Sequence, residues 1–415
     1  MLEKLTEQEF NAFSKTHKNS LFFQSSYWGK LKSGTGWKYD LVGLKKDGKV
    51  KASSLLLSKK IPIFNQYIFY SPRGFLLDYN DKDLIKQYTE EIKKYVKKEK
   101  GIFFKINPLI IYQERDKNGC VVEKGVHNTR LVEYLKELGY QHTGFTTTYG
   151  QDLEPRWISV LDIKNKTEDE ILKNMRSTAR WGIQNSYKHG LELIELDKDK
   201  IEKFKELMQH TGQRRGFIDR PLSYYQKMYE EFSKDDKIKI MIVELNTLKY
   251  IENLNIQYNE TMKKIESVKK EGLRKELESQ LESIQKKIKE IEKIKSQKGE
   301  KITVAGGLFM TFGTQVVSLF GASYREYMKF NGQYFLNFEM IKYAIKNGYE
   351  KYNFYGITGE FNKESPMYGL FDFKRSFGAE VEELVGEFTY ITNHFYNNIY
   401  NIMFKTYRAI KRMRK

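Results

Sequence analysis

The sequence has a single cysteine, Cys120, among its 415 residues. One thiol cannot form a disulfide within the chain, and it cannot supply a zinc site built from cysteines. The six histidines show no HxH or HxxxH spacing, which would place two imidazoles on one metal ion. We therefore expect neither a disulfide framework nor a metal site.

Long apolar runs are also missing. The most apolar window, LFMTFGTQVVSLFGASY, is interrupted by Thr, Gln, Gly and Ser, and it is too short and too polar to cross a bilayer. The first residues, MLEKLTEQEF, lack the apolar segment of a secretory signal peptide. The sequence therefore predicts a cytoplasmic protein.

The usual nucleotide-binding motifs fail as well. Residues 43–49, GLKKDGK, match the start of a P-loop, but Val50 stands where the motif needs a Ser or Thr for Mg²⁺. No GxGxxG follows a predicted strand. Mixed α+β units of this order are typical of acetyltransferases, yet their acyl-CoA loop, Q/RxxGxG/A, is matched only in part by residues 213–218, which end on Ile218. We expect no cofactor.

What is present is an excess of positive charge. Lys and Arg total 72 against 54 Asp and Glu, which gives a formal net charge of +18. A surplus of this size favours polyanionic partners, such as nucleic acid, anionic lipid headgroups or phosphorylated substrates. The alternative is that a lysine-rich surface serves only solubility.

The chain shows two successive runs of alternating helix and strand signals, which meet near residue 152. In the first run, the segment TEQEF begins a helix with a capping box, and Asp47-Gly48 marks a hairpin turn between two strands. In the second run, a strand at 157–163 precedes a helix over 167–190. This order predicts an α+β protein made of two units of similar construction.

The segment from about Leu245 to Gly299 is different, with no proline and almost no aromatic residue. Its apolar residues recur at spacings of three and four, the pattern of a coiled-coil seam. The later half of the seam consists of Leu277, Leu281, Ile284, Ile288, Ile291 and Ile294, and the earlier half of Ile251, Leu254, Tyr258, Met262 and Ile265. Two halves of nearly equal length predict an antiparallel helical hairpin that turns near Gly272. A single continuous helix is the alternative.

The C-terminal segment, FYNNIYNIMFKTYRAIKRMRK, places its apolar residues on one helical face. The other face and the tail carry Lys405, Arg408, Lys411, Arg412, Arg414 and Lys415. Such a helix can pack on the protein with a solvated basic edge, or it can lie on an anionic membrane or on RNA.

Five stretches, in order along the chain, resemble the Fem family of non-ribosomal peptidyltransferases, which build branches on peptidoglycan stem peptides. They are FFQSSYWGKLKSGTGW, YSPRGFLLDYND, NMRSTARWGIQNSYKHGLEL, RRGFIDRPLSYYQKMY, and FYGITGEF followed by YGLFDFKRSFGAEVEELVGEF. The second stretch departs from the family pattern, because Phe75 replaces the usual proline. The resemblance covers nearly the whole chain, and the helical segment matches the members that carry one.

The resemblance implies two acetyltransferase-like (GNAT) domains in tandem, the second interrupted by an antiparallel coiled-coil arm. The first domain would comprise residues 1–152 and about 385–415, because the C-terminal helix would return to it. The second would comprise residues 153–244 and 300–384. The arm would comprise residues 245–299.

The resemblance also implies a reaction. An amino acid (Ala, Ser or Gly) would pass from aminoacyl-tRNA to the side-chain amine of residue three of a lipid-linked or UDP-linked muropeptide, in interpeptide bridge formation. Both substrates are polyanions, which agrees with the positive net charge, and an aminoacyl ester needs no ATP. Further candidate partners are another Fem-like protein and, through the basic C-terminal helix, the inner face of the membrane. The alternatives are tRNA-dependent aminoacylation of a lipid or a protein N-terminus, and a non-catalytic RNA- or membrane-binding module.

Lys374 is the candidate catalytic residue, and it lies between Phe373 and Phe377 in the last of the matching stretches. We predict that it stabilises the oxyanion that forms when the amine attacks the ester carbonyl. The two phenylalanines would exclude water and strengthen its field, while the negative substrate would keep it charged. The alternative is an ordinary lysine that extends its ammonium to solvent.

By the match to family positions, Lys32 and Arg220 are predicted to hold the phosphates of the acceptor, with Arg214 and Arg215 as rivals of Arg220. Arginine suits a bidentate phosphate contact and lysine a point-charge contact. The other residues predicted to bind substrate are Trp28, Tyr224, Tyr368 and Phe373.

The general base is the least defined part of the predicted site. Family members often carry an acidic residue before a proline at the end of a buried strand, but this chain has Asn107-Pro108 there. Asp78 is the remaining candidate, with the acceptor's own carboxylate or water as alternatives.

Overall fold

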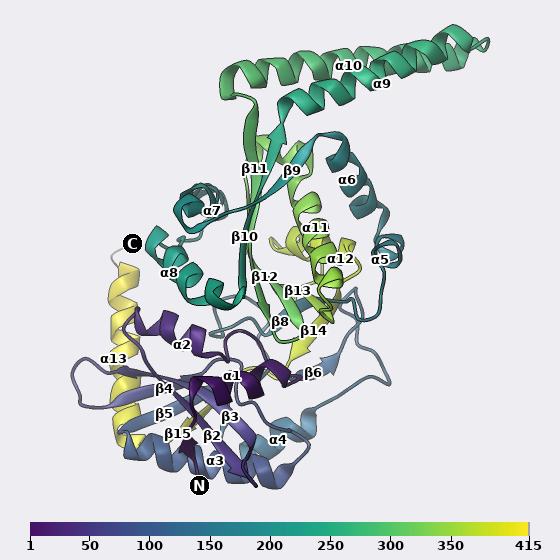
Figure 1. Cartoon of the computed structure of the whole chain (residues 1–415). Helices are drawn as coiled ribbons and strands as arrows, with labels where there is room; N and C mark the ends of the chain where they lie inside the picture. Colours follow the sequence, from purple (N-terminus) through teal and green to yellow (C-terminus); the bar gives the residue numbers. More distant parts are fainter. Residues whose placement is uncertain (414–415) are drawn as a thin grey trace. The chain divides into compact units, whose positions relative to one another are not determined.

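The computed structural model describes residues 1–413, and side chains as far as residue 406. The chain forms two compact units, whose elements are labelled in Figure 1. Unit 1 comprises Met1–Asp162, Thr311–Val317 and the chain from Tyr349 onward, and unit 2 comprises Ile163–Met310 and Ser318–Gly348. Both units contain helices and strands, so the fold is a mixed α+β fold, as the sequence predicts.

Unit 1 contains a seven-stranded sheet with the strand order β1-β2-β3-β4-β5-β15-β7. The strands are β1 (Glu3–Lys4), β2 (Lys38–Lys46), β3 (Lys49–Lys60), β4 (Tyr67–Ser71), β5 (Gly101–Ile106), β7 (Gln141–His142) and β15 (Phe388–Ile391). Asp47 and Gly48 form the predicted turn between β2 and β3, with φ of 52° and 72°. Positive φ at both positions gives the turn whose twist matches that of the flanking strands.

The helices of unit 1 pack on its strands and support the candidate site. They are α1 (Glu7–Thr16), α2 (Ser26–Ser33), α3 (Lys82–Lys98), α4 (Thr129–Glu137), α12 (Tyr368–Ser376) and α13 (His394–Met413). Thr6 caps α1 through the predicted capping box with Glu9. Helix α3 buries Ile85 and Ile92 in a core that it shares with Phe104 of β5. The apolar spacing of α3 therefore fixes which face of the helix meets the sheet.

The first turns of α13 pack on unit 1. Tyr396 contacts Phe64 and Tyr400 contacts Phe103, with ring centroids 5.7 and 5.6 Å apart. This part of the helix therefore follows the packing alternative. Of the predicted basic residues, the following lie outside the residues whose side chains are described: Arg408, Lys411, Arg412, Arg414 and Lys415. Among the described residues, no helix has the length and apolar character needed to cross a membrane.

An eight-stranded sheet is divided between the units. Unit 1 holds the order β6-β14-β8-β13-β12 and unit 2 the order β12-β11-β10-β9, with residues of β11 and β12 in both. The strands are β6 (Ile111–Glu114), β8 (Trp157–Asp162), β9 (Leu191–Glu195), β10 (Ile238–Asn246), β11 (Lys301–Phe312), β12 (Gln315–Ser323), β13 (Lys351–Ile357) and β14 (Glu380–Leu384). The boundaries of the two units thus differ from those of the predicted domains. Residues 349–384, predicted to belong to the second domain, fall in unit 1, where β14 pairs with β6.

The helices of unit 2 include one break that the sequence did not predict. They are α5 (Glu168–Asn174), α6 (Ser177–Lys188), α7 (Ile201–Arg215), α8 (Leu222–Phe232) and α11 (Gly332–Lys346), with short 3-10 segments η1 (Lys198–Lys200), η2 (Ser233–Asp235) and η3 (Arg325–Phe330). The single helix predicted over 167–190 is wrong, because Met175 and Arg176 have extended backbone. The Nη1 of Arg180 donates to the carbonyl oxygens of Lys173 and Met175, at 3.0 and 2.7 Å. This guanidinium satisfies carbonyls at the end of α5 that a continuous helix would have bonded itself.

Two long helices, α9 (Thr247–Ser267) and α10 (Glu271–Lys298), lie side by side and extend away from the strands of unit 2 (Figure 1). Leu254 of α9 is buried, and so are four seam residues of α10: Leu277, Leu281, Ile284 and Ile291. The predicted seam is wrong at Met262, which is 37% exposed, while its neighbour Thr261 is buried. The chain reverses over residues 268–270, and Gly272 lies in the first turn of α10.

Candidate active site

Lys374 lies on the buried face of α12, with only 7% of the residue exposed. Phe371, on the same face, belongs to a buried cluster with Trp157 and Ile357. Because residues three apart share a face of a helix, packing Phe371 into this cluster also turns Lys374 inward. The side chain is therefore enclosed and does not extend to solvent.

The Nζ of Lys374 donates hydrogen bonds to two backbone carbonyls of β13. Gly356 O accepts at 2.6 Å and Tyr355 O at 3.3 Å. Burial lowers the pKa of Lys374 from its ordinary value of 10.5 to about 7. The carbonyl oxygens oppose this trend, because an ammonium makes stronger hydrogen bonds than a neutral amine. The group is therefore poised to change charge near neutral pH.

Strand β13 is irregular at the point where it meets Lys374. Its pairing with β8 shifts register between Asn353 and Tyr355, and Tyr355 has a φ of 65°. In a regular strand, successive carbonyls point in opposite directions along the sheet. The left-handed residue breaks this alternation, so the carbonyls of Tyr355 and Gly356 both face one ammonium.

A cavity of about 230 Å³ lies beside Gly356 in unit 1. Its lining consists of residues 146–150 and 152–157 together with Ile357. A Cβ atom on Gly356 would lie 2.7 Å from the Cγ of Pro155, so the cavity wall touches the backbone that holds Lys374. The volume is below the range of roughly 300 to 1,000 Å³ that is typical of pockets for drug-sized ligands. It suits a group of the size of one amino acid.

Helix α2 carries the other predicted cation of unit 1. The Nζ of Lys32 lies 5.5 Å from the centroid of the Trp28 ring. Trp28 is 7% exposed, its ring packs edge-on against Phe23 at 4.7 Å, and its Nε1 is buried without a hydrogen-bond partner. The ammonium of Lys32 can donate to an anionic oxygen beside this ring.

Arg214, Arg220 and Tyr224 belong to unit 2. Arg214 lies in the last turn of α7, and its Nε is buried without a hydrogen-bond partner. Burial, together with the positive charges of Arg215 and Arg325, lowers the pKa of Arg214. Arg220 lies over the ring of Tyr224, 5.5 Å from its centroid. Of the rival arginines, Arg214 therefore has the clearest unmet donor for an anion.

The two predicted aromatic residues near Lys374, Tyr368 and Phe373, lie with it on α12, and both are half-buried. The hydroxyl of Tyr368 accepts a hydrogen bond from Arg375 at 3.1 Å. The ring of Phe373 packs edge-on against Phe377, with centroids 5.2 Å apart. The ring of Phe373 thus packs beside the last turn of α12, which carries Lys374.

Asp78 and Asn107 both have local hydrogen-bonding roles. The exposed carboxylate of Asp78 accepts from the backbone and side-chain amides of Asn80, at 3.0 and 3.1 Å. Asn107 is 2% exposed, and its Oδ1 accepts from the backbone of Arg73 at 2.8 Å while its Nδ2 donates to the hydroxyl of Tyr70 at 3.0 Å. An amide can accept and donate at once, which an ionised carboxylate at this position could not do.

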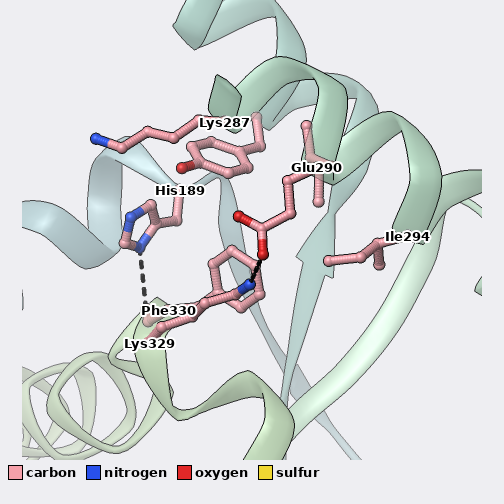
Figure 2. A pocket seen from close by; sticks show the side chains of 8 residues that line it. His189, Lys287, Glu290, Ile294, Lys329 and Phe330 are labelled. Atoms are coloured by element: carbon pink, nitrogen blue, oxygen red, sulfur yellow. Dashed lines mark hydrogen bonds and ion pairs between the residues drawn. The ribbon is translucent and has the colours of Figure 1, made fainter. Parts of the chain in front are cut away.

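A second cavity, of about 140 Å³, lies in unit 2 at the base of the helical hairpin (Figure 2). Glu290 of α10 forms an ion pair with Lys329, and the Nδ1 of His189 lies 3.1 Å from the carbonyl oxygen of Phe330. Burial lowers the pKa of His189, which favours the neutral ring that donates from Nδ1 to this carbonyl. The ion pair joins α10 to η3, and the His189 contact joins the end of α6 to η3.

Sequence reasoning missed three residues next to the Lys374 site. The hydroxyl of Tyr355 donates to the carboxylate of Glu154, and the Nη2 of Arg73 donates to the carbonyl oxygen of Pro155 at 2.7 Å. Arg73, which is 1% exposed, lies in one of the matching stretches, so its motif was an available signal. Nothing in the local sequence marks Tyr355 for left-handed backbone.

Comparison with known proteins adds the following findings. The model of the FemAB family matches residues 5–405. The aminoacyltransferase FemA of Staphylococcus epidermidis is 32% identical over 423 residues, which cover 99% of each chain. FemA of Staphylococcus aureus is 30% identical over 396 residues, which cover 92% of this chain and 93% of the relative. The crystal structure of FemX matches with a TM-score of 0.79 at 29% identity, over 96% of this chain and 99% of that one.

Proposed function

The chain belongs to the FemAB family and is an aminoacyltransferase, and on that premise we propose that it builds the interpeptide bridge of peptidoglycan. The donor is an aminoacyl-tRNA that carries Ala, Ser or Gly. The acceptor is the side-chain amine of residue three of a lipid-linked or UDP-linked muropeptide. The observation that carries the proposal is the buried Nζ of Lys374, which bonds to the carbonyl of Gly356, a residue that adjoins Pro155 in the wall of a cavity of amino-acid size.

In the proposed reaction, the acceptor amine attacks the carbonyl carbon of the aminoacyl ester, and negative charge develops on the carbonyl oxygen. The ammonium of Lys374 has three N–H donors. Two of them serve Tyr355 O and Gly356 O, and the third is proposed to donate to the developing oxyanion. The new C–N bond forms, the ester C–O bond breaks, and the proton lost by the amine balances the one gained by the 3′-oxygen of the tRNA. A fixed donor of this kind in a dry site typically contributes about 3 to 4 kcal/mol.

The proposal extends to the fold. We take residues 1–152 with about 385–415 as one GNAT-like domain, and residues 153–244 with 300–384 as a second. Residues 245–299 form the coiled-coil arm between strands of the second domain. The seven-stranded sheet and the paired helices α9 and α10 support this division, while the pairing of β6 with β14 departs from it. The further partners proposed are another Fem-like protein and an anionic membrane surface that meets the basic end of the chain.

Phosphate recognition is proposed for the cations of both units. Lys32 would bind one phosphate oxygen beside the unpartnered indole N–H of Trp28. Independently of this contact, Arg214 or Arg220 of unit 2, with Tyr224 beside Arg220, is proposed to bind a phosphate oxygen, and the unpartnered Nε favours Arg214 of the two. Each contact is made to a part of the substrate that does not react, so it should affect binding more than chemistry.

Replacing Lys32 with alanine is expected to raise the KM for the muropeptide about tenfold and to leave kcat within about twofold. A charge-assisted hydrogen bond contributes roughly 1.5 kcal/mol, which corresponds to a factor of about ten. Because the contact is present in both the ground state and the transition state, kcat should not change. Steady-state kinetics with varied muropeptide measures both values.

Lys30→Ala is the matched control, since Lys30 lies on the same helix and pairs with Glu7 at 2.6 Å. This ion pair is partly exposed and contributes little. If both variants raise KM equally, the phosphate role of Lys32 is wrong.

A transfer assay tests the proposed function directly. The purified chain is incubated with a tRNA charged with labelled Gly, Ala or Ser, and with lipid-linked or UDP-linked muropeptide. We expect label to move to the muropeptide with at least one donor. Transfer only to a lipid or to a protein N-terminus would replace the proposed acceptor. Binding of the RNA with no transfer to any acceptor would contradict the proposal and favour an RNA-binding module.

A further inference from the structure

The β-bulge of β13 is held by contacts that go beyond ordinary strand pairing. The backbone N–H of Tyr355 donates to the side chain of Asn353 at 2.8 Å, and its hydroxyl donates to the carboxylate of Glu154. Its ring stacks on that of Phe23, with centroids 6.3 Å apart. The segment 154–155 is itself tied to Arg73, whose Nη2 donates to Pro155 O. All of these residues belong to unit 1.

Tyrosine is an unusual choice for this backbone conformation. A φ of 65° lies in the left-handed region, which glycine adopts without strain and which a residue with a large side chain adopts only when its surroundings hold it there. Glycine at this position would satisfy the backbone, but it would have no ring and no hydroxyl. Strained residues that persist in this way are concentrated at functional sites.

The consequence of the bulge is local to the candidate site. It turns two successive carbonyls toward the Nζ of Lys374, and it places the hydroxyl of the same residue on Glu154, which lines the cavity beside Gly356. The backbone carbonyl of Tyr355 therefore contacts the ammonium of Lys374, and its hydroxyl contacts Glu154 in the cavity wall.

We propose that Tyr355 is a positioning residue for aminoacyl transfer, whose hydroxyl, bonded to Glu154, holds the bulge that directs two carbonyls at Lys374. Only the kinetic consequence of this inference rests on the proposed function. The arrangement of the bulge around the ammonium is independent of which donor and acceptor the enzyme uses.

The phenol is suited to this task. Burial, with the negative charge of Glu154 nearby, raises the pKa of Tyr355, so its hydroxyl remains a donor at any pH of interest. Replacement by phenylalanine removes the contacts of the hydroxyl with Glu154 and Arg73 and keeps the ring that stacks on Phe23. Without its anchor the bulge should relax toward regular strand geometry, which would withdraw one carbonyl from Lys374 and admit water.

The test uses full-length Tyr355→Phe and two readouts. The first is the titration of the Lys374 Nζ, followed by NMR of a lysine-labelled protein and assigned by its loss in Lys374→Met. We expect the titration midpoint in Tyr355→Phe to move up by about one pH unit, because the entry of water raises the pKa of a fully buried ammonium by more than the loss of the longer carbonyl contact, to Tyr355 O at 3.3 Å, lowers it. The second readout is transfer kinetics at pH 6, where Lys374 is charged in both proteins; there we expect kcat to fall about 10- to 100-fold, because water weakens the field of the ammonium, and KM for both substrates to stay within about twofold.

Tyr140→Phe is the matched control. Tyr140 is also buried, and its hydroxyl bonds to Thr89 at 3.1 Å in the core of the seven-stranded sheet. It should leave both the titration and kcat unchanged. Glu154→Gln should reproduce part of the effect, and the double variant with Tyr355→Phe should add little to it, as expected for two residues that act as one unit.

Two results would overturn the inference. One is a Tyr355→Phe protein with an unchanged Lys374 titration and unchanged kcat. The other is an equal fall in kcat for Tyr355→Phe and Tyr140→Phe, which would mark a general loss of stability. If the wild-type chain transfers nothing, the proposed function fails, but the titration still decides whether Tyr355 controls Lys374.

Discussion

Replacing Lys374 with methionine is expected to reduce transfer by about 10²- to 10³-fold and, at the same time, to make the folded protein more stable. The loss of activity follows from removing the proposed oxyanion donor, whose contribution of about 3 to 4 kcal/mol corresponds to this range. The gain in stability follows from burial. Methionine fills a similar volume without a charge that must be removed from water.

The stability change has a defined dependence on pH. The pKa of Lys374 is about 7 in the folded chain against an ordinary value of 10.5. Below pH 7 both states hold the proton, and the folded state carries the full penalty of burying it. Between pH 7 and 10.5 the unfolded chain holds more protons, so the stability of the wild type rises with pH. The advantage of methionine should therefore be largest near or below pH 7 and should fall toward pH 10.5.

Denaturant unfolding at pH 6 and pH 10 measures this effect. The full difference between the two pKa values corresponds to about 5 kcal/mol, and we expect about 2 to 4 kcal/mol at pH 6, because the two carbonyl contacts offset part of the penalty. Lys363→Met is the control, since Lys363 is exposed and its replacement should change stability by less than about 0.5 kcal/mol. A Lys374→Met protein that is less stable than the wild type at pH 6 would contradict the claim that burying the ammonium of Lys374 destabilises the folded chain.

Replacing Glu383 with alanine is expected to destabilise the protein by about 3 to 5 kcal/mol. The carboxylate of Glu383 accepts from the Nε of Arg115 at 2.5 Å and from the guanidinium of Arg156. The side chains of Glu383 and Arg156 are 4% and 1% exposed. Burial already lowers the pKa of Arg156 despite this partner. Removing Glu383 would leave the buried guanidinium of Arg156 without the carboxylate with which it pairs, which is among the most costly single changes.

Glu382→Ala provides a control one residue away. The carboxylate of Glu382 pairs at 3.0 Å with Lys351, whose side chain is 41% exposed, so its loss should cost less than about 1 kcal/mol. Urea unfolding of both variants compares a buried with an exposed ion pair on the same strand. Equal losses in the free energy of unfolding would contradict the account of the Arg115–Glu383–Arg156 cluster. Transfer should also fall in Glu383→Ala, because Arg156 lines the cavity beside Gly356.

Elements with strong local signals were predictable from the sequence. The capping box at Thr6 and the Asp47-Gly48 turn lie where their residues indicate, because each depends on contacts within a few positions. The apolar spacing of α10 likewise identified most of its buried residues. Features that depend on distant contacts were not predictable: the break at Met175 requires the guanidinium of Arg180, and no spacing rule places it there.

The candidate site was likewise predictable only in part. A lysine between two phenylalanines could be expected to be enclosed, and the match to a known family pointed to Lys374 and Lys32. The partners of Lys374 could not be derived, because they are backbone carbonyls that a bulge at Tyr355 brings together. Family members often carry an acidic residue at the position of Asn107, and the sequence does not explain why this chain has an amide there. The structure gives a reason, because the amide donates to Tyr70 and accepts from the backbone of Arg73.

The most direct test of the central claim, that the ammonium of Lys374 drives the transfer, is the pH dependence of kcat/KM for the wild type divided by that for Lys374→Met. The division cancels the titration of the acceptor amine, which is common to both proteins. If the charged form of Lys374 stabilises the oxyanion, the ratio is high below pH 7 and falls tenfold per unit above a midpoint near 7, where the proton is lost. A ratio that stays flat across pH 6 to 9, or one close to unity throughout, would contradict the claim.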